Sequence, residues 1–227
     1  MRVAFDKELN ELNRSFSQLG NLVNEAIYKS IKAFINHDKK LAKEVIENDD
    51  RVNQLEVELE GKCIEIIALQ QPVTADLRTI ITILKASADL ERMGDHAVNI
   101  AKATIRIKGS KRSEEIEGMI AEAGEKIKAM GQDVLQAFVE MDTKSALHFD
   151  DRDDEIDEIT DNLKRKSVKR VVDDPELAFG ATDYTLVGSS IERIGDYITN
   201  IAEWIVYHET GKIKELNISH DYENFED

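Results

Sequence analysis

Apolar residues recur along two long stretches of the chain at alternating steps of four and three residues. The first stretch runs from Phe5 through Leu12 to Ala33, and the second runs from Ile116 to Met141. Side chains three and four residues apart share one face of a helix, whereas a β-strand would alternate with a period of two. The spacing therefore predicts long amphipathic helices in both stretches.

Turn signals divide each half of the chain into three helices. Asp38 follows a break in the pattern and offers an N-cap, and the helix that it starts is expected to end near Pro72. Pro175 marks the corresponding turn of the second half. Gly109 and Gly211 are expected to close the last helix of each half, which we place at residues 74–107 and 176–210.

The two halves are a repeat. Residues 91–101 (ERMGDHAVNIA) and 192–202 (ERIGDYITNIA) are identical at 7 of 11 positions, at an offset of 101 residues. We therefore predict an all-α fold of six long helices, arranged as two similar three-helix bundles related by a pseudo-twofold axis. The predicted units are residues 1–109, residues 110–211 and an acidic tail at 212–227.

Composition supports this fold and narrows the function. The chain has 2 Pro and 11 Gly among 227 residues, too few for the turns of an all-β protein. Its net charge of −16 disfavours a nucleic-acid partner, and no apolar run reaches the length of a membrane span. The start lacks an apolar signal core, and the single cysteine, Cys63, fits a reducing compartment, so we expect a cytoplasmic protein.

Oxygen-bearing side chains are placed alike in the two halves. Glu91, Asp95 and Asn99 follow one face of the predicted third helix, turn above turn, and the preceding helix carries a polar row of its own. Carboxylate and amide oxygens from two adjacent helices suit hard cations such as Mg²⁺, Mn²⁺ or iron. The candidate metal ligands from spacing and geometry are therefore Glu91, Asp95, Asn99, Asp49 and Asn53 in the first half, and Glu192, Asp196, Asn200, Asp150 and Asp154 in the second.

A solvated helix face is an alternative interpretation of the same pattern. Arg92 would then pair with Asp89, while Gly94 and its repeat Gly195 would allow a neighbouring helix to approach closely. His96 could join a metal site or lie beside Arg92. We expect Cys63 to be a small buried hydrophobe, and Trp204 with Tyr207 to be core or interface aromatics.

The repeated segments resemble the PhoU family of phosphate-signalling regulators. The sequences that carry the resemblance are DLERMGDHAVNIAKA at 89–103, IERIGDYITNIAEW at 191–204 and QQPVTADLR at 70–78. The resemblance implies an all-α protein of two three-helix bundles without catalytic activity. It also implies an adaptor between the ATPase subunit of a phosphate ABC transporter and a sensor histidine kinase, which restrains the starvation response when phosphate is plentiful.

The resemblance also implies metal ions at Glu/Asp-x-x-x-Asp motifs, which fall on Glu91 with Asp95 and on Glu192 with Asp196. The metal would be iron in multinuclear clusters, or another divalent cation such as Mg²⁺, Mn²⁺ or Zn²⁺. Tyr197 departs from the histidine that the family often has at this position, so the two sites are expected to differ. The acidic tail is also longer than is usual for the family.

Two other functions remain open at this stage. A carboxylate-bridged metal enzyme would use the same acids, but the sequence shows no base placed to work with them. A structural helical-bundle protein would bind neither metal nor kinase. The long amphipathic helices also indicate a homodimer.

Overall fold

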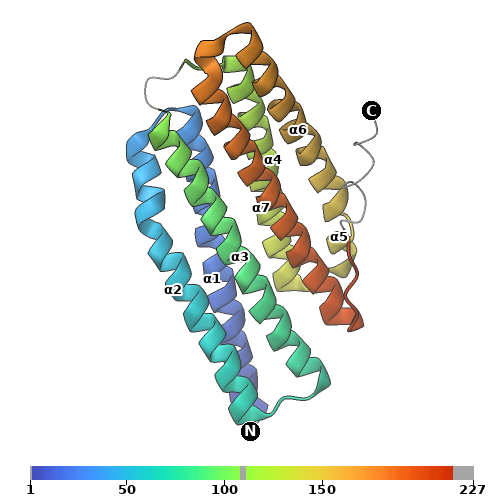
Figure 1. Ribbon diagram of the computed structural model, residues 1–227. Helices are drawn as coiled ribbons and strands as arrows, with labels where there is room; N and C mark the ends of the chain where they lie inside the picture. Colours follow the sequence, from blue (N-terminus) through green and yellow to red (C-terminus); the bar gives the residue numbers. More distant parts are fainter. Residues whose placement is uncertain (1, 108–110, 217–227) are drawn as a thin grey trace.

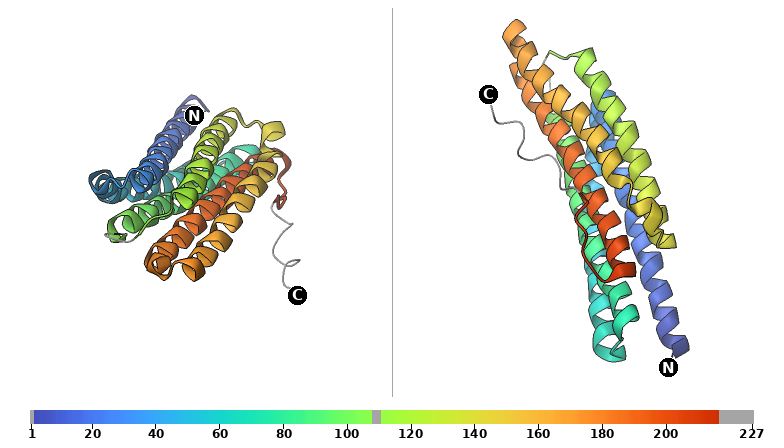
Figure 2. Two further views of the ribbon diagram at one scale, coloured as in Figure 1. Left: turned by 90° about the horizontal axis from the view of Figure 1, so that it is seen from above. Right: turned by 90° about the vertical axis from the view of Figure 1, so that its right-hand side faces the viewer.

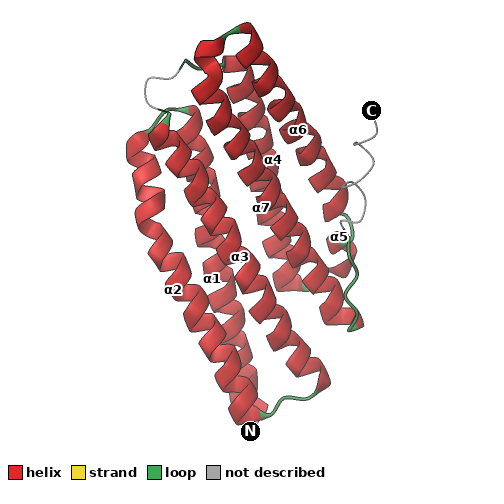
Figure 3. Ribbon diagram, viewed as in Figure 1, coloured by secondary structure: helices red, strands yellow, loops and turns green. Residues whose placement is uncertain are grey.

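The computed structural model describes residues 2–107 and 111–216, and helices account for nearly all of them (Figure 3). These two ranges contain six long helices and no strand, which confirms the predicted fold class. The long helices are α1 (Arg2–Ile35), α2 (Lys39–Gln70), α3 (Thr74–Arg106), α4 (Glu114–Glu140), α6 (Phe149–Asp173) and α7 (Ala178–Thr210). Two short elements complete the list: helix α5 (Thr143–Ala146) and the 3-10 turn η1 (Pro175–Leu177).

The helix ends follow the turn signals in the sequence. The Asp38 carboxylate accepts hydrogen bonds from the backbone N–H groups of Lys40 and Leu41, both at 3.0 Å, and so caps α2 as predicted. Asp174 caps η1 in the same way, through the N–H of Glu176 at 3.3 Å. Gly211 ends α7 with a φ of 70°, in the left-handed region that glycine adopts without strain.

The six long helices form two three-helix bundles that lie side by side (Figure 1). In the first bundle α2 packs on α1 and α3, and in the second α6 packs on α4 and α7. Contacts between α3 and α7, and between α1 and α4, join the two bundles. Helices α2 and α6 therefore lie at opposite edges of the molecule, which is elongated along the helix axes (Figure 2).

The two halves pack closely where they join. A Cβ atom on Gly20 of α1 would overlap with Leu135 of α4, and one on Gly131 of α4 would overlap with Asn24 of α1. The two glycines thus allow α1 and α4 to cross closely. Between α3 and α7, the ring of His96 lies 5.9 Å from the ring of its repeat, Tyr197.

The core is aliphatic, with few aromatic rings. Leu, Ile, Val and Ala side chains of all six long helices form one continuous buried cluster. Phe16 of α1 stacks on Phe138 of α4, with ring centroids 3.9 Å apart, so the cluster crosses the boundary between the bundles. Cys63 belongs to this cluster and is fully buried, as expected for a small hydrophobe.

A buried polar junction anchors the segment between the two halves. The Tyr184 hydroxyl of α7 donates to Glu117 at 2.9 Å and accepts from the Ser113 N–H at 2.8 Å. The Arg112 guanidinium contacts the Glu117 carboxylate and donates to the carbonyl of Phe34 in α1 at 3.0 Å. The start of α4 is therefore fixed against helices from both bundles.

Three details differ from the sequence prediction or lie outside it. Helix α5, which the sequence did not predict, lies in the connection between α4 and α6. Helix α3 ends at Arg106, and Gly109, expected to close it, lies outside the described residues. Of the acidic tail, residues 212–216 are described, and the Leu216 N–H donates to Glu203 of α7 at 2.7 Å.

The described helices lack any apolar stretch of the length needed to cross a lipid bilayer.

Candidate functional site: two acidic clusters

The first acidic cluster lies where α2 passes antiparallel to α3. It consists of Asp49, Asn53 and Glu56 on α2, together with Glu91 and Asp95 on α3. Spacings of three and four residues place each set on one face of its helix, and the two faces meet. Four of these five residues are candidates predicted from the sequence, and Glu56 belongs to the predicted polar row of α2.

Burial and like charge act together in the first cluster. Partial burial raises the pKa of Asp49, and the nearby carboxylate of Asp95 raises it further. The pKa of Glu91 is raised for the same reasons, first by burial and then by Asp95, with a smaller contribution from Glu56. A cation bound here would relieve this repulsion.

Arg92 pairs with members of the first cluster. Its guanidinium lies 3.7 Å from the Glu91 carboxylate and 4.0 Å from that of Asp95. The expected pairing of Arg92 with Asp89 is wrong, because the Asp89 carboxylate turns toward α7 and accepts from the indole N–H of Trp204 at 2.9 Å. Trp204 thus lies at the seam between the bundles and packs against the core, as predicted for it.

The second acidic cluster lies between α6 and α7 and is more acidic than the first. Its centre consists of Asp153 and Asp157 on α6 with Glu192 and Asp196 on α7, and Asp154 and Asp161 lie within electrostatic range. Glu192, Asp196 and Asp154 were candidates from the sequence. Asp153 was not among the predicted candidates. The repeat offset of 101 aligns it with Val52, a core position of the first half, and this alignment was the signal that Asp153 is buried.

Asp153 is the buried acid of the second cluster, with only 2% of its surface exposed. One of its carboxylate oxygens lies 3.3 Å from the Thr199 hydroxyl. Burial, followed by the charges of Asp157 and Asp196, raises the pKa of Asp153 to about 8. The pKa of Asp157 is raised to about 7 by burial and by the charges of Glu192 and Asp196. Both carboxyls therefore hold protons in the folded protein at a pH where exposed carboxyls are ionised.

An internal cation offsets part of the charge of the second cluster. The Lys164 ammonium contacts the Glu192 carboxylate and lies 3.6 Å from that of Asp161. Arg193 pairs with Asp196 at 3.1 Å, as its repeat Arg92 does with Asp95. The first cluster has no counterpart of Lys164, because the aligned residue is the buried Cys63.

The remaining three candidate ligands are placed differently. The Asn200 amide hydrogen-bonds to Asp89 across the seam between α7 and α3, so the structure does not bring it to the second cluster. Asn99 lies half-buried on α3, one turn beyond Asp95. Asp150 lies half-buried in the first turn of α6, one turn before Asp154.

The two glycines of the repeated motif allow the acidic helices to pack closely, as expected. A Cβ atom on Gly94 would lie 3.3 Å from a methyl group of Val52 and 4.0 Å from a carboxylate oxygen of Asp49. A Cβ atom on Gly195 would overlap with the carboxylate of Asp153. In each half the glycine thus makes room for the side chain of α2 or α6 that faces it.

The donor set of the clusters suits hard cations, but the side chains do not form a finished coordination sphere. Among the residues that the structure describes, no three Asp, Glu, His or Cys side chains come close enough together to hold one ion. The ring of His96 lies 5.9 Å from that of Tyr197, and burial lowers the pKa of His96 although the nearby Asp95 carboxylate acts in the opposite direction. The arrangement is a pair of concentrated negative surfaces rather than a rigid cage.

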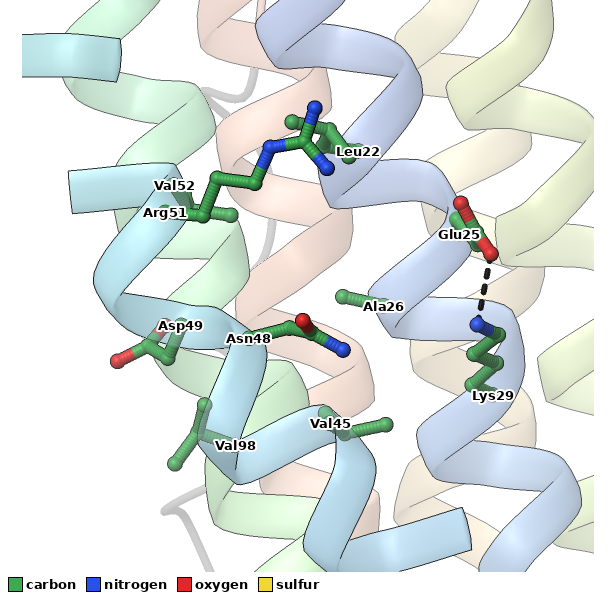
Figure 4. Close-up of a pocket in the computed structure, with 10 residues that line it drawn as sticks. All are labelled: Leu22, Glu25, Ala26, Lys29, Val45, Asn48, Asp49, Arg51, Val52 and Val98. Carbon is green, nitrogen blue, oxygen red and sulfur yellow. Dashed lines mark ion pairs between the residues drawn. The ribbon is translucent and has the colours of Figure 1, made fainter. Parts of the chain in front are cut away.

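A cavity of about 200 Å³ lies beside the first cluster, between α1 and α2 (Figure 4). Asp49 and Val52 contribute to its wall, and Lys29 of α1 forms ion pairs with Glu25 and Glu44, both at 2.7 Å. Its wall contains both acidic and basic side chains, Glu25 and Asp49 with Lys29 and Arg51, so the lining does not select a ligand by charge alone. The acidic faces therefore remain the distinctive chemical feature of the helix hairpins.

Comparison with known proteins matches the chain over nearly its full length. The family described as "PhoU domain" matches twice, at residues 16–104 and 120–205, so each half contains one copy. The phosphate-specific transport system accessory protein PhoU homolog of Clostridium acetobutylicum is 36% identical over 217 residues, covering 95% of this chain and 99% of that protein. The homolog of Streptococcus pneumoniae is also 36% identical and is covered completely.

Two crystal structures share the fold. The phosphate transport system regulatory protein PhoU from Streptococcus pneumoniae superposes with a TM-score of 0.86 at 36% identity, covering 92% of this chain and 99% of that one. PhoU from Pseudomonas aeruginosa superposes with a TM-score of 0.87 at 32% identity, covering 92% and 100%. The arrangement of both bundles, acidic hairpins included, is thus similar to that of these two proteins.

Proposed function

The chain belongs to the PhoU family, and we propose that it is a regulatory accessory protein of a phosphate transport system. The observation that carries this proposal is the doubled domain match, which covers both halves of the chain and both acidic clusters. Relatives that match over nearly their whole length are named as accessory proteins of that system. A similar extent and fold support a similar role.

The finer proposal is a cytoplasmic adaptor. It would bind the ATPase subunit of the transporter and a sensor histidine kinase, and would restrain the starvation response when phosphate is plentiful. Long rigid helices with exposed side chains support docking, since they offer preformed surfaces that lose little entropy on binding. The coupling would be a difference in affinity of the chain for the two states of the kinase.

A non-catalytic role is part of this proposal. The one thiol of the chain, Cys63, is buried within α2, and burial raises its pKa to about 12, so it is held as an unreactive thiol. A carboxylate-bridged metal enzyme remains the alternative. It would be favoured by hydrolysis of phosphate esters, or by oxygen chemistry with iron, that disappears when Glu91 and Glu192 are replaced by glutamine.

Binding to purified partners tests the adaptor proposal. The full chain should co-elute with the ATPase subunit and with the cytoplasmic domain of the kinase at micromolar concentrations, with Mg²⁺ or Mn²⁺ present. In cells, deletion of the gene should raise expression of a phosphate-starvation reporter in rich phosphate. Unchanged reporter expression together with no co-elution would rule out the adaptor.

A second proposed activity is cation binding at the two acidic clusters. The supporting observation is that burial, followed by the repulsion of neighbouring carboxylates, raises the pKa values of Asp49 and Glu91 in the first cluster and of Asp153 and Asp157 in the second. Glu91 with Asp95, and Glu192 with Asp196, would provide the principal ligands. Divalent ions or iron would reduce this repulsion and draw the carboxylates together.

Elemental analysis of untagged protein tests the cation proposal. We expect the unmodified chain to retain metal after gel filtration, and a variant with Glu91→Gln, Asp95→Asn, Glu192→Gln and Asp196→Asn to lose most of it. A matched control replaces Glu114, Glu122, Glu125 and Glu158, which are exposed, by glutamine. Equal metal content in all three proteins would contradict the proposal.

A further inference from the structure

Helix α2 has an apolar stripe that nothing in its own bundle covers. Val57 and Ile64 are 63% and 55% exposed, and Gly61 and Ala68 lie on the same face and are also exposed. The four positions follow one another at steps of four, three and four residues, which is the spacing of a seam between two packed helices. We call Val57, Gly61, Ile64 and Ala68 the α2 stripe.

Gly61 leaves the middle of the α2 stripe open to close approach from outside. A glycine in a helix interior lowers helix stability relative to alanine. Most other glycines in the described helices lie against a side chain of a neighbouring helix, whereas a Cβ atom on Gly61 of α2, like one on Gly118 of α4, would have nothing within 4 Å. No contact within the described chain therefore explains this glycine.

The α2 stripe is bordered by acids. Glu58 and Glu65 lie along one side and Glu60 along the other, and all three are exposed. Among the described residues these three carboxylates have no ion-pair partner within 4.0 Å. A helix that packs on this stripe is therefore expected to have apolar side chains bordered by basic ones.

Helix α6 presents such a surface on the opposite edge of the molecule. Val168 and Val172, one turn apart, are 66% and 79% exposed, and Arg165 and Lys169 border them. Neither of these two cations has an acidic partner among the described residues, whereas their neighbours Lys166 and Arg170 both bind Glu115 at 2.6 Å. We call Arg165, Val168, Lys169 and Val172 the α6 stripe.

We propose that the α2 stripe binds the α6 stripe of a second copy of this chain. The two stripes are complementary in charge and both contain exposed apolar side chains, and they lie on equivalent helices of the two halves. Helices α2 and α6 lie at opposite edges of one molecule (Figure 1), so they can meet only between copies. This surface gives the expected self-association a defined contact, and it is independent of the proposed adaptor role.

The contact joins different faces of the two copies, which sets the form of the assembly. Once the α2 stripe of one copy binds the α6 stripe of another, one α6 stripe and one α2 stripe remain available. Association should therefore continue as concentration rises, and it should weaken as salt screens the charges. The mean mass from sedimentation should increase steadily between about 1 and 300 μM at about 0.1 M salt, and less so at about 0.5 M.

Charge reversal in two separate chains tests the pairing. The first variant contains Glu58→Lys and Glu65→Lys, and the second contains Arg165→Glu and Lys169→Glu. Each variant alone would place like charges on both stripes, so we expect self-association at least about tenfold weaker than in the unmodified chain. A 1:1 mixture restores opposite charges in both possible contacts and should recover association.

Two further variants test the apolar part of the contact. Gly61→Gln should preserve the helical fold, because the space beside Gly61 is open, yet it should block association. Ile64→Ser should also weaken association, while Val139→Ser, at a 61% exposed position on α4, should not. Circular dichroism and thermal unfolding of each variant show whether the monomer is intact.

Several outcomes would overturn the proposal. One is an unmodified chain that stays monomeric over the whole concentration range. Another is a mixture of the two charge variants that fails to associate although both are folded. If the α2 variants lose association while the α6 variants keep it, the α2 stripe binds a different surface and the proposed pairing is wrong.

Discussion

The two acidic clusters occupy equivalent places in the two halves, but their interiors differ. Beneath the first cluster, Val52 of α2 and Val98 of α3 are both buried, and the repeat replaces this pair with Asp153 of α6 and Thr199 of α7. The same backbone arrangement thus buries an apolar pair in one half and an acid with a hydroxyl in the other. A duplicated fold preserves the positions of helices while leaving each buried pair free to change chemistry.

The surroundings of the clusters differ in the same direction. The second cluster has more carboxylates and an internal cation, Lys164, where the first has the buried Cys63. The contacts at the seam between the bundles also depart from the pseudo-twofold symmetry. Asp89 and Trp204 form a hydrogen bond on one side of the axis. On the other side, the equivalent positions are occupied by Ser190 and Ala103. Each difference adds charge or a polar contact to one side only.

Alanine in place of each repeated glycine should show the largest difference between the halves. In Gly195→Ala the new methyl group would overlap with the buried Asp153 carboxylate, so we expect a loss of about 3 kcal/mol in the free energy of unfolding. In Gly94→Ala the nearest atom is a methyl group of Val52 at 3.3 Å, and the gain in helix propensity of about 1 kcal/mol offsets the crowding. Urea denaturation of both variants measures the difference.

A double variant provides the control for this pair. Asp153→Ala together with Gly195→Ala removes the overlapping carboxylate and should recover most of the lost stability. Equal losses for Gly94→Ala and Gly195→Ala would show that the buried acid does not set the difference between the halves.

Giving the second half the apolar pair of the first should stabilise the protein in a pH-dependent way. The pKa of Asp153 is about 8 in the folded state and near 3.8 when exposed, so the folded protein binds the proton more tightly. The contribution of protonated Asp153 to the free energy of unfolding is therefore fully present below about pH 4 and is lost as pH rises toward 8. We expect Asp153→Val with Thr199→Val to be about 2 kcal/mol more stable than the unmodified chain at pH 8, and nearly equal to it at pH 4.

Unfolding midpoints in urea at several pH values measure this effect. The control is Asp154→Asn, an exposed neighbour in the same cluster, which should change the pH dependence little. A double variant that is less stable than the unmodified chain at pH 8 would mean that the pair of Asp153 and Thr199 stabilises the fold.

Removing the internal cation of the second cluster should make the two clusters differ further in cation affinity. Without Lys164 the Glu192 carboxylate loses its partner, so we expect Lys164→Gln to bind Mn²⁺ several-fold more tightly, a change of about 1 kcal/mol. Titration calorimetry with Mn²⁺ measures this change. Lys166→Gln, which removes a cation bound to Glu115 away from the cluster, is the matched control and should leave Mn²⁺ affinity unchanged.

The smallest expected effect is a change in the fluorescence of Trp204 at the seam between the bundles. Burial raises the pKa of Asp89 to about 6, and the indole N–H of Trp204, the single tryptophan of the chain, donates to this carboxylate. Trp204 fluorescence should therefore change with pH with a midpoint near 6, and Asp89→Asn should abolish the change. A midpoint that is unaltered in Asp89→Asn would assign the titration to another group.

The sequence was a good guide to helices and a partial guide to the site. Asp38, Pro72, Pro175 and Gly211 lie at the predicted helix ends, because capping and proline geometry are local properties of the chain. Asp49, Glu91 and Asp95 come together as predicted, since antiparallel helices joined by a short turn must pair. Helix α5 was missed because a four-residue helix has too short a pattern to detect.

The errors at the site have a common origin in side-chain direction. Arg92 and Asp89 are three residues apart on one helix, a spacing that allows an ion pair, but Trp204 from the other bundle binds Asp89 instead. Asn200 likewise hydrogen-bonds across the seam rather than within its hairpin. In both cases a residue more than 100 positions away in the sequence decides the contact, and helical spacing contains no information about it.

By itself the sequence determined that this protein is all-helical, duplicated and acidic along the second and third long helices of each half, because periodicity, capping and repetition act within the chain. The tertiary structure decided which acid is buried, which cation reaches it, and which helix faces remain uncovered. Asp153 shows the reason most clearly. Its pKa depends on how closely Gly195 lets α7 approach α6, and that distance exists only once the helices have packed.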